Sequence, residues 1–255
     1  YHGCNRNPAV ASLCSRDDEN GAKMKIKKIY ELSHRIDPEK EEYHMEVDSR
    51  QVEGWPQFAK YPRLPEAQYL ISEVILCTHV GTHVEMPFHH DKQGKDTGDF
   101  PVENLVGETV TLDISGFGNN EEISKSDLIK IAGDQIKPGD IVFFYTGLDK
   151  NYYTDKQHNR PYFATDAIGW LIDEAKIKLM GVDTSGHEIR HKDSTPVVGQ
   201  PNHELLLGSG IPLIEYLTNL KPILGKRVWT FTLPVRIMGV ESFPARVIAV
   251  DWEEA

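Results

Sequence analysis

Four residues with metal-binding side chains lie close together in one short stretch, residues 77–90, which reads CTHVGTHVEMPFHH. His79, His83, Glu85 and His89 all occupy odd positions in this stretch. Because the side chains of an extended strand alternate between its two faces, an extended conformation would place all four on one face. Imidazole and carboxylate groups that converge on one point are typical ligands of a divalent metal ion. The stretch therefore predicts a metal site.

Other interpretations of these residues are weaker. Two histidines four positions apart also bind zinc on the helices of zinc proteases, but Gly81, Thr82 and the β-rich residues before them argue against a helix. A chance cluster of surface histidines is the simplest alternative, and a closed structural metal site would be expected to use cysteines. Cys77 is a conceivable soft ligand, although a cysteine inside an apolar run such as 74–77 is more often a buried free thiol.

The overall composition limits the class of protein and its partners. A chain of 255 residues is long enough for one large domain. Its formal net charge of −11 argues against nucleic acid and against an anionic membrane surface as partners. The three cysteines are too few for a disulfide framework, and no segment approaches the roughly 18 consecutive apolar residues of a membrane span.

The first 23 residues differ in composition from the rest of the chain. They are polar and aperiodic, and they lack the apolar central region of a signal peptide. We expect residues 1–23 to be a disordered leader or an added extension, and residues 24–255 to form the folded domain. A cytoplasmic location is expected.

The remaining sequence predicts an α/β domain with a mainly β core and a few helices. The apolar runs 141–145 and 179–182 are typical of buried strands, and helical spacing over 166–176 places a helix between them. This order predicts a β-α-β unit with parallel strands.

One polar stretch, residues 35–65, contains four prolines and shows no periodicity. A connection of this length is often a lid or a binding loop. Its aromatic residues Trp55, Phe58 and Tyr61 are therefore predicted to bind substrate as apolar pocket walls, although aromatic residues more commonly pack such a loop onto the body of the domain.

The stretch from His79 to His89 resembles the H-x-G-T-H-x-D-x-P-x-H signature of the cyclase-like metal-dependent hydrolases, which include bacterial kynurenine formamidase and isatin hydrolase. The resemblance extends over roughly residues 26–250. It includes the end of the opening strand, the central strand, a G-V-D-T strand end, a late His…Glu segment and the final hairpin, at residues 31–34, 139–147, 181–184, 202–215 and 233–246.

The resemblance implies a swivelling β/β/α fold that holds one or two zinc or manganese ions. His79, His83 and Glu85 would bind the first ion, and His203 and Glu215, with Glu85 bridging, would complete a second site. The family usually has Asp where this chain has Glu85, and the extra methylene leaves the number and identity of the ions open.

The resemblance also implies a function. His89 would be the general acid/base of a hydrolase that cleaves an amide or ester bond, often cyclic, in a small carbonyl substrate through a metal-activated water. A metal-dependent cyclase or dehydratase and a catalytically inactive, metal-stabilised binding protein are the alternatives. The family commonly forms homodimers or homotetramers, so self-association is expected.

Four further residues are expected to lie outside this machinery. Asp183 is predicted to be a structural carboxylate at a strand end, and His34 to have a structural, hydrogen-bonding role. His90 and His187 are predicted to be surface histidines without a role.

Overall fold

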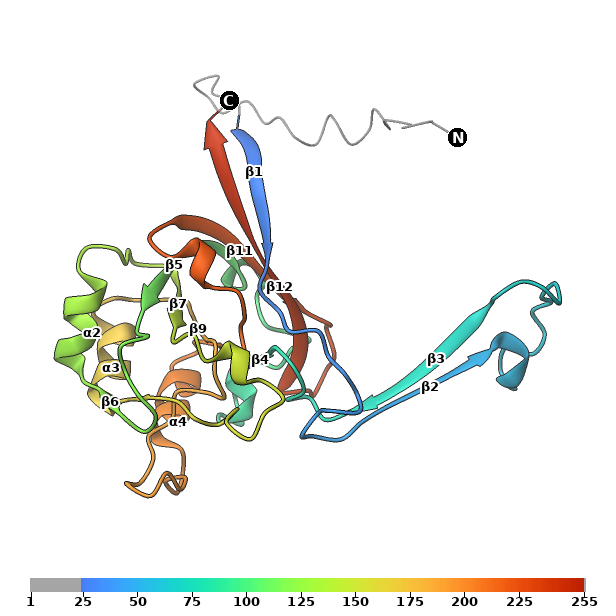
Figure 1. Cartoon of the computed structure of the whole chain (residues 1–255), viewed down its shortest axis with the longest axis horizontal. Helices are drawn as coiled ribbons and strands as arrows, with labels where there is room; N and C mark the ends of the chain where they lie inside the picture. Colours follow the sequence, from blue (N-terminus) through green and yellow to red (C-terminus); the bar gives the residue numbers. More distant parts are fainter. Residues whose placement is uncertain (1–23, 255) are drawn as a thin grey trace.

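The computed structural model describes residues 24–254, so the expected extension over residues 1–23 lies outside the described residues. These residues form one mainly β domain with three described α-helices (Figure 1). The α-helices are α2 (Lys125–Ala132), α3 (Thr165–Asp173) and α4 (Pro201–Gly208). The strands are β1 (Met24–Glu31), β2 (Met45–Gln51), β3 (Leu70–Leu76), β4 (His83–Glu85), β5 (Val106–Asp113), β6 (Glu122–Ile123), β7 (Ile141–Tyr145), β8 (Tyr162–Phe163), β9 (Leu179–Val182), β10 (Leu213–Glu215), β11 (Arg227–Pro234) and β12 (Ser242–Glu254).

The main sheet closes into a barrel. Its strand order is β1-β12-β11-β5-β7-β9-β10-β4, and an additional pairing of β12 with β4 joins the two ends of a seven-stranded ring. Strand β1 adds to β12 outside this ring. The predicted fold class, one α/β domain with a mainly β core and few helices, is confirmed.

Alternation along β7 divides the core into two layers. Ile141 and Phe143 belong to the cluster that fills the barrel, whereas Val142 and Phe144 pack against the helices on the other face. The barrel interior is tight at Gly181 of β9, where a Cβ atom would lie 2.6 Å from Cδ1 of Phe143. A strand that is buried on both faces requires a continuous apolar run, which is why β7 reads IVFFY.

The predicted β-α-β unit is also confirmed. Strands β5, β7 and β9 run parallel, with α2 and α3 in the two connections. Helix α2 begins with a capping box in which Ser124 and Asp127 each satisfy a backbone N–H of the other. The three helices lie together on one side of the barrel (Figure 1).

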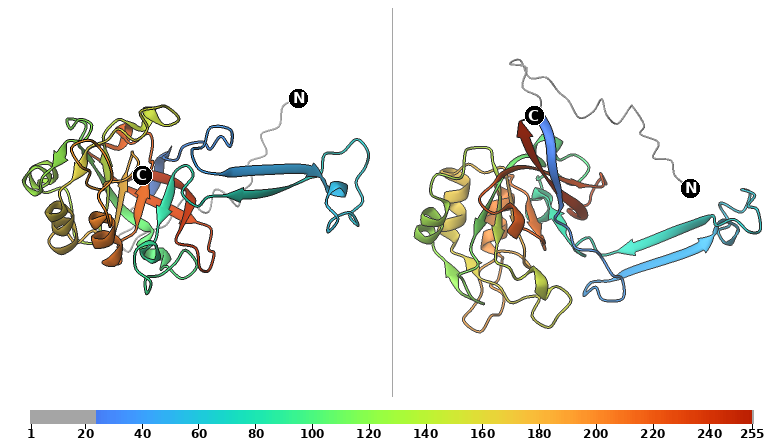
Figure 2. Two further views of the ribbon diagram at one scale, coloured as in Figure 1. Left: turned by 90° about the horizontal axis from the view of Figure 1, so that it is seen from below. Right: turned by 45° about the horizontal axis from the view of Figure 1, so that its top comes forward.

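A long hairpin, which we call the arm (residues 45–76), projects from the opposite side of the barrel (Figures 1 and 2). It consists of β2 and β3 and the segment that joins their far ends. The prediction of an aperiodic connection over residues 35–65 is therefore wrong for Met45–Gln51, which form β2. Strand β2 has no core to face and is polar, so its sequence, MEVDSRQ, lacks the apolar alternation that predicts a strand.

Among residues 24–254, no helix is both long and apolar enough to cross a membrane.

Candidate metal centre

The stretch that carries the candidate ligands is only partly extended. Strand β4 covers His83–Glu85, the residues before it form turns, and Pro87–His89 form a short 3-10 helix, η3. Gly81 has a φ of +64°, and a Cβ atom there would lie 2.6 Å from Cγ1 of Ile36, so this turn requires glycine. The prediction of one continuous strand is wrong, yet the four side chains still converge.

The first ligand group combines the turn with strand β4. Nδ1 of His79 lies 3.2 Å from Nε2 of His83 and 3.2 Å from Oε1 of Glu85. Nε2 of His83 lies 3.7 Å from the same Glu85 oxygen. Two ligands about 2.1 Å from a tetrahedral ion lie about 3.4 Å apart, so the three atoms fit around one divalent ion.

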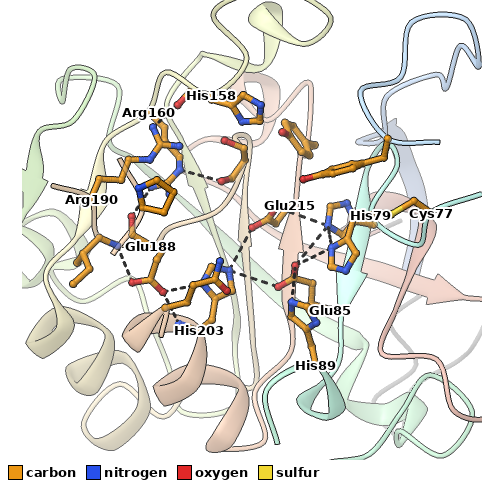
Figure 3. Close-up of a pocket in the computed structure, with 17 residues that line it drawn as sticks. Cys77, His79, Glu85, His89, His158, Arg160, Glu188, Arg190, His203 and Glu215 are labelled. Atoms are coloured by element: carbon orange, nitrogen blue, oxygen red, sulfur yellow. Dashed lines mark hydrogen bonds and ion pairs between the residues drawn. The ribbon is translucent and has the colours of Figure 1, made fainter. Parts of the chain in front are cut away.

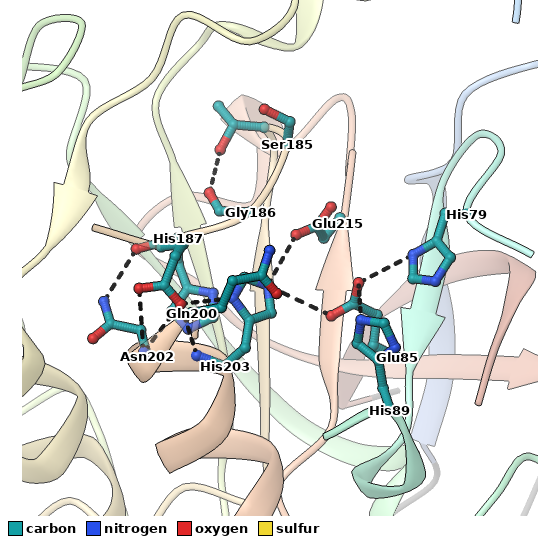
Figure 4. A network of polar contacts seen from close by, with 12 residues as sticks. His79, Glu85, His89, Ser185, Gly186, His187, Gln200, Asn202, His203 and Glu215 are labelled. Carbon is teal, nitrogen blue, oxygen red and sulfur yellow. Dashed lines mark hydrogen bonds and ion pairs between the residues drawn. The ribbon is translucent and has the colours of Figure 1, made fainter. Parts of the chain in front are cut away.

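The second group joins Glu85 to the far end of the site. Nε2 of His203 on α4 lies 3.7 Å from Oε2 of Glu85 and 3.6 Å from Oε1 of Glu215. Strand pairing sets this arrangement, because β10 places Glu215 directly opposite His83 of β4. The two oxygens of Glu85 therefore face different ligand groups (Figure 4).

The environment of Glu85 indicates whether these residues can bind a metal ion. The residue is 3% exposed, and its Oε2 is a buried atom with no hydrogen-bond partner among the described residues. A buried carboxylate oxygen without a donor is costly unless a cation binds it. The side chain of Glu85 is long enough for its two oxygens to face both ligand groups. The residues present thus fit a divalent ion.

The second nitrogen of each candidate histidine ligand is held by an acceptor. Nδ1 of His83 lies 2.9 Å from the carbonyl oxygen of Gly81, and Nε2 of His79 lies 3.3 Å from Oε1 of Glu241. Nδ1 of His203 lies 2.9 Å from Oε2 of Glu188. Such contacts fix the tautomer and leave the other nitrogen free for a metal.

Glu188 also positions the helix that carries His203. Its carboxylate accepts hydrogen bonds from the backbone N–H groups of Asn202 and His203, in the first turn of α4. One carboxylate therefore caps the helix and orients the imidazole.

Contacts between carboxylates and imidazoles shift the pKa values of Glu85 and His203. Burial opposes ionisation of Glu85, but hydrogen bonds from His79 and His83 hold the pKa of its carboxyl well below the usual range. Burial likewise opposes a charge on His203, but its hydrogen bonds with Glu188 and Glu215 raise its pKa to about 10. Since a metal must displace the proton from Nε2 of His203, metal affinity is expected to fall as the pH falls.

His89, the predicted general acid/base, lies at the end of η3. Its Nε2 is 3.9 Å from Oε1 of Glu85, and its side chain is 26% exposed to the pocket. Burial lowers its pKa, so a neutral imidazole faces the ligand groups near neutral pH. A third group of possible ligands combines His89 with His79 and Glu241. The position suits either proton transfer or a ligand role.

The ligand groups form one wall of a pocket of about 450 Å³. Cys77 and Tyr43 line it, but no candidate ligand group of the described residues includes Cys77. Trp55, Phe58 and Tyr61 do not line this pocket, because β2 carries them to the far end of the arm. Within one chain, these three aromatic residues therefore do not form the walls of this pocket, contrary to the prediction.

The other histidines differ from their predictions. His187 is fully buried rather than on the surface, with its ring centroid 4.6 Å from that of His203, and burial lowers its pKa to about 3. His90 stacks on His203 at 5.5 Å. His34 stacks on Tyr152 at 4.3 Å, and its buried Nε2 has no hydrogen-bond partner among residues 24–254, so its structural role comes from stacking.

Asp183 has the structural role that its position predicted. Its carboxylate accepts hydrogen bonds from the backbone N–H groups of Thr146 and Gly147 and from the Thr146 hydroxyl. It ties the end of β9 to the end of β7 beside the pocket.

Sequence reasoning missed the acidic residues behind the ligands. Glu188 lies in a polar loop 15 positions before its partner His203, and Glu241 lies 162 positions after His79. No local spacing links either pair. A carboxylate behind each metal-binding histidine is a general expectation, but only the fold selects which one.

Comparison with known proteins assigns the chain to a family. Residues 30–188 match the family model Cyclase, described as "Putative cyclase", and the chain belongs to this family. It is 28% identical to the kynurenine formamidase of Salinibacter ruber over 188 residues, which cover 73% of this chain and 82% of that protein. It is 28% identical to Cyclase-like protein 2 of Arabidopsis thaliana over 88% of this chain and 79% of the relative.

A solved structure shows the same fold. Isatin hydrolase A from Ralstonia solanacearum superposes with a TM-score of 0.73 at 18% identity. The match covers 98% of this chain and 99% of that chain. The predicted membership of the cyclase-like family is thus confirmed.

The Glu188 contact leads to a quantitative prediction. Glu188→Gln is expected to lower the affinity for zinc or manganese by about 10- to 100-fold, because the amide cannot hold His203 as a carboxylate does. Competition with a chelating dye measures the affinity. Glu204→Gln, an exposed position on the same helix, is the matched control. If a folded Glu188→Gln variant binds the metal as tightly as the wild type, Glu188 does not contribute to metal binding.

Proposed function

We propose that the protein is a metal-dependent hydrolase that cleaves an amide or ester bond, often cyclic, in a small carbonyl substrate. One or two zinc or manganese ions would be held by five residues, His79, His83, Glu85, His203 and Glu215. The observation that carries this proposal is the buried carboxylate of Glu85, whose two oxygens face two separate ligand groups. The names of the relatives, kynurenine formamidase and isatin hydrolase, support an amide as the bond that is cleaved.

The chain's own residues divide the work of hydrolysis. A bound divalent ion would polarise the substrate carbonyl and acidify water in the pocket. His89, as a neutral imidazole, accepts a proton from the attacking water and returns it to the leaving nitrogen or oxygen. Glu241 and Glu188 keep His79 and His203 in their tautomers, so the site is organised before substrate binds.

A metal-dependent cyclase or dehydratase is the second candidate, which the description of the family model favours. The same ligands and the same base would serve it, since a Lewis acid also assists proton removal next to a carbonyl. Product analysis in ¹⁸O-labelled water separates the two, because hydrolysis incorporates solvent oxygen and dehydration releases water. The placement of His89 beside Glu85 argues against an inactive binding protein.

The test is a screen of N-formyl aromatic amines, isatins and lactones with added zinc or manganese. We expect turnover of at least one class by the wild type and none by His83→Ala, because His83 belongs to the first ligand group. Equal turnover by both proteins would contradict the proposal.

Self-association and location also remain proposals. One face of the arm exposes a run of apolar side chains, in which Val47 pairs with Val74 and Leu70 lies on the same side. These side chains are 47%, 50% and 45% exposed, respectively. An exposed apolar surface of this kind is typical of a protein interface, and we propose that a second copy of the chain covers it, in a homodimer or a homotetramer. A cytoplasmic location is proposed with it, without nucleic acid or membrane partners.

Val74→Asp tests the proposed interface. We expect it to shift the oligomer toward monomer in light scattering, because a charge would be buried without a partner. Glu73→Gln, on the opposite face of β3, is the control and should leave the mass unchanged. A wild-type monomer at micromolar concentration would contradict the proposal.

A further inference from the structure

The pocket has a second wall, which contains no candidate metal ligand. Two arginines, Arg160 and Arg190, line it, and we call them the arginine wall. Figure 3 shows them on one side of the pocket, with His79 and His89 on the other. The metal centre does not explain why two cations line this side.

Arg160 is held firmly but without a carboxylate. It is 3% exposed, and its Nε donates to the carbonyl oxygen of Ser185 at 3.0 Å. Its Nη1 donates to the carbonyl oxygens of Pro161 at 3.1 Å and of Glu188 at 2.8 Å. No described residue accepts a hydrogen bond from Nη2. This nitrogen is also not one of the fully buried side-chain atoms that lack a hydrogen-bond partner. The open donor therefore belongs to a side chain that lines the pocket.

Arg190 lies near Arg160 and is half-buried. Its Nη1 donates to the carbonyl oxygen of His158 at 2.6 Å, which fixes the guanidinium at the pocket edge. No carboxylate within residues 24–254 approaches either guanidinium within the 4.0 Å of an ion pair. Burial and the charge of Arg190 lower the pKa of Arg160 to about 10, and the more distant carboxylates of Glu215 and Glu188 only partly oppose this.

This arrangement is electrostatically incomplete. A desolvated guanidinium without a counter-ion is unfavourable, and a second guanidinium nearby adds repulsion. The planar fork of arginine matches the two oxygens of a carboxylate better than any neutral group. Three hydrogen bonds from Arg160 to backbone carbonyls position the loop, but among residues 24–254 no carboxylate forms an ion pair with this guanidinium.

We propose that the arginine wall binds a carboxylate of the substrate, so that the hydrolase acts on anionic amides or esters whose carboxylate lies at the end away from the scissile bond. This inference rests on the proposed function for the location of the scissile bond. The ligand groups then receive the carbonyl at one end of the pocket, and the arginines receive the carboxylate at the other.

A pair of probes tests the preference. The two probes differ only in a carboxylate that cannot reach the scissile carbonyl. The ratio of kcat/KM for 4-formamidobenzoate to that for formanilide therefore measures how much this carboxylate improves the substrate. We expect the wild type to favour the anion, and Arg190→Gln to lower the ratio by about tenfold or more, the loss of one charge-assisted hydrogen bond. Arg160→Lys keeps the charge but loses the fork and should also lower the ratio. Arg246→Gln, 82% exposed outside this pocket, is the charge-matched control.

A binding measurement separates failure of this inference from failure of the proposed function. Calorimetry on metal-loaded protein is expected to show benzoate binding more tightly than benzamide, with the difference reduced about tenfold in Arg190→Gln. If formanilides are not hydrolysed, the proposed function fails, while the benzoate titration still decides the carboxylate site. If both the kcat/KM ratio and benzoate binding are the same in wild type, Arg190→Gln and Arg246→Gln, the inference is overturned.

Discussion

Glu85→Gln is expected to lower kcat/KM about a thousandfold and to reduce the bound zinc or manganese well below the wild-type content. The amide has the shape of the carboxylate but no charge, and Glu85 is the residue that belongs to both ligand groups. Loss of a Lewis acid removes several kcal/mol of transition-state stabilisation, and each 1.36 kcal/mol is a factor of ten in rate. Mass spectrometry of the metal content and steady-state kinetics measure the two effects.

Two further variants make this result specific. Glu85→Asp keeps the carboxylate and shortens the side chain by one methylene, and we expect it to keep metal and much of the activity. Glu204→Gln controls for removal of one negative charge near α4. Wild-type metal content in Glu85→Gln would contradict the proposed bridging role, whatever the effect on activity.

His89→Ala is expected to lower kcat by about 10²- to 10⁴-fold while the metal content stays the same. The reason is the loss of the imidazole that moves protons, which lies 3.9 Å from Glu85 without belonging to the two groups that Glu85 joins. Kinetics and metal analysis on one preparation check this prediction.

His90→Ala is the matched control for His89. His90 is the neighbouring histidine, its ring contacts Gln200, and it does not line the pocket. If His89→Ala loses metal, His89 is a ligand together with His79 and Glu241. If its turnover is unchanged, the general-base assignment is wrong.

The candidate ligand set could be predicted from the sequence because two local rules were sufficient. Period two along β4 puts His83 and Glu85 on one face, and the resemblance of the late His…Glu segment, residues 202–215, supplied His203 and Glu215. The turn before β4 could not be predicted from parity. It depends on Gly81 and on the side chain of Ile36, which is 45 positions earlier in the chain.

The arm and the arginine wall could not be predicted from the sequence. Strand β2 escapes prediction because a hairpin without a core needs no apolar alternation. Arg160 and Arg190 are distant from the ligands in sequence, and an arginine in a polar loop normally faces solvent. Only the fold shows that these two line the pocket.

The central claim is that divalent metal at the Glu85 centre is required for hydrolysis. The most direct measurement is turnover of an N-formyl aromatic amine by chelator-treated protein, before and after titration with zinc or manganese, with metal content determined on the same samples. We expect no turnover without metal and recovery in proportion to bound metal, up to one or two ions per chain. Full turnover in a protein with only trace metal would contradict it.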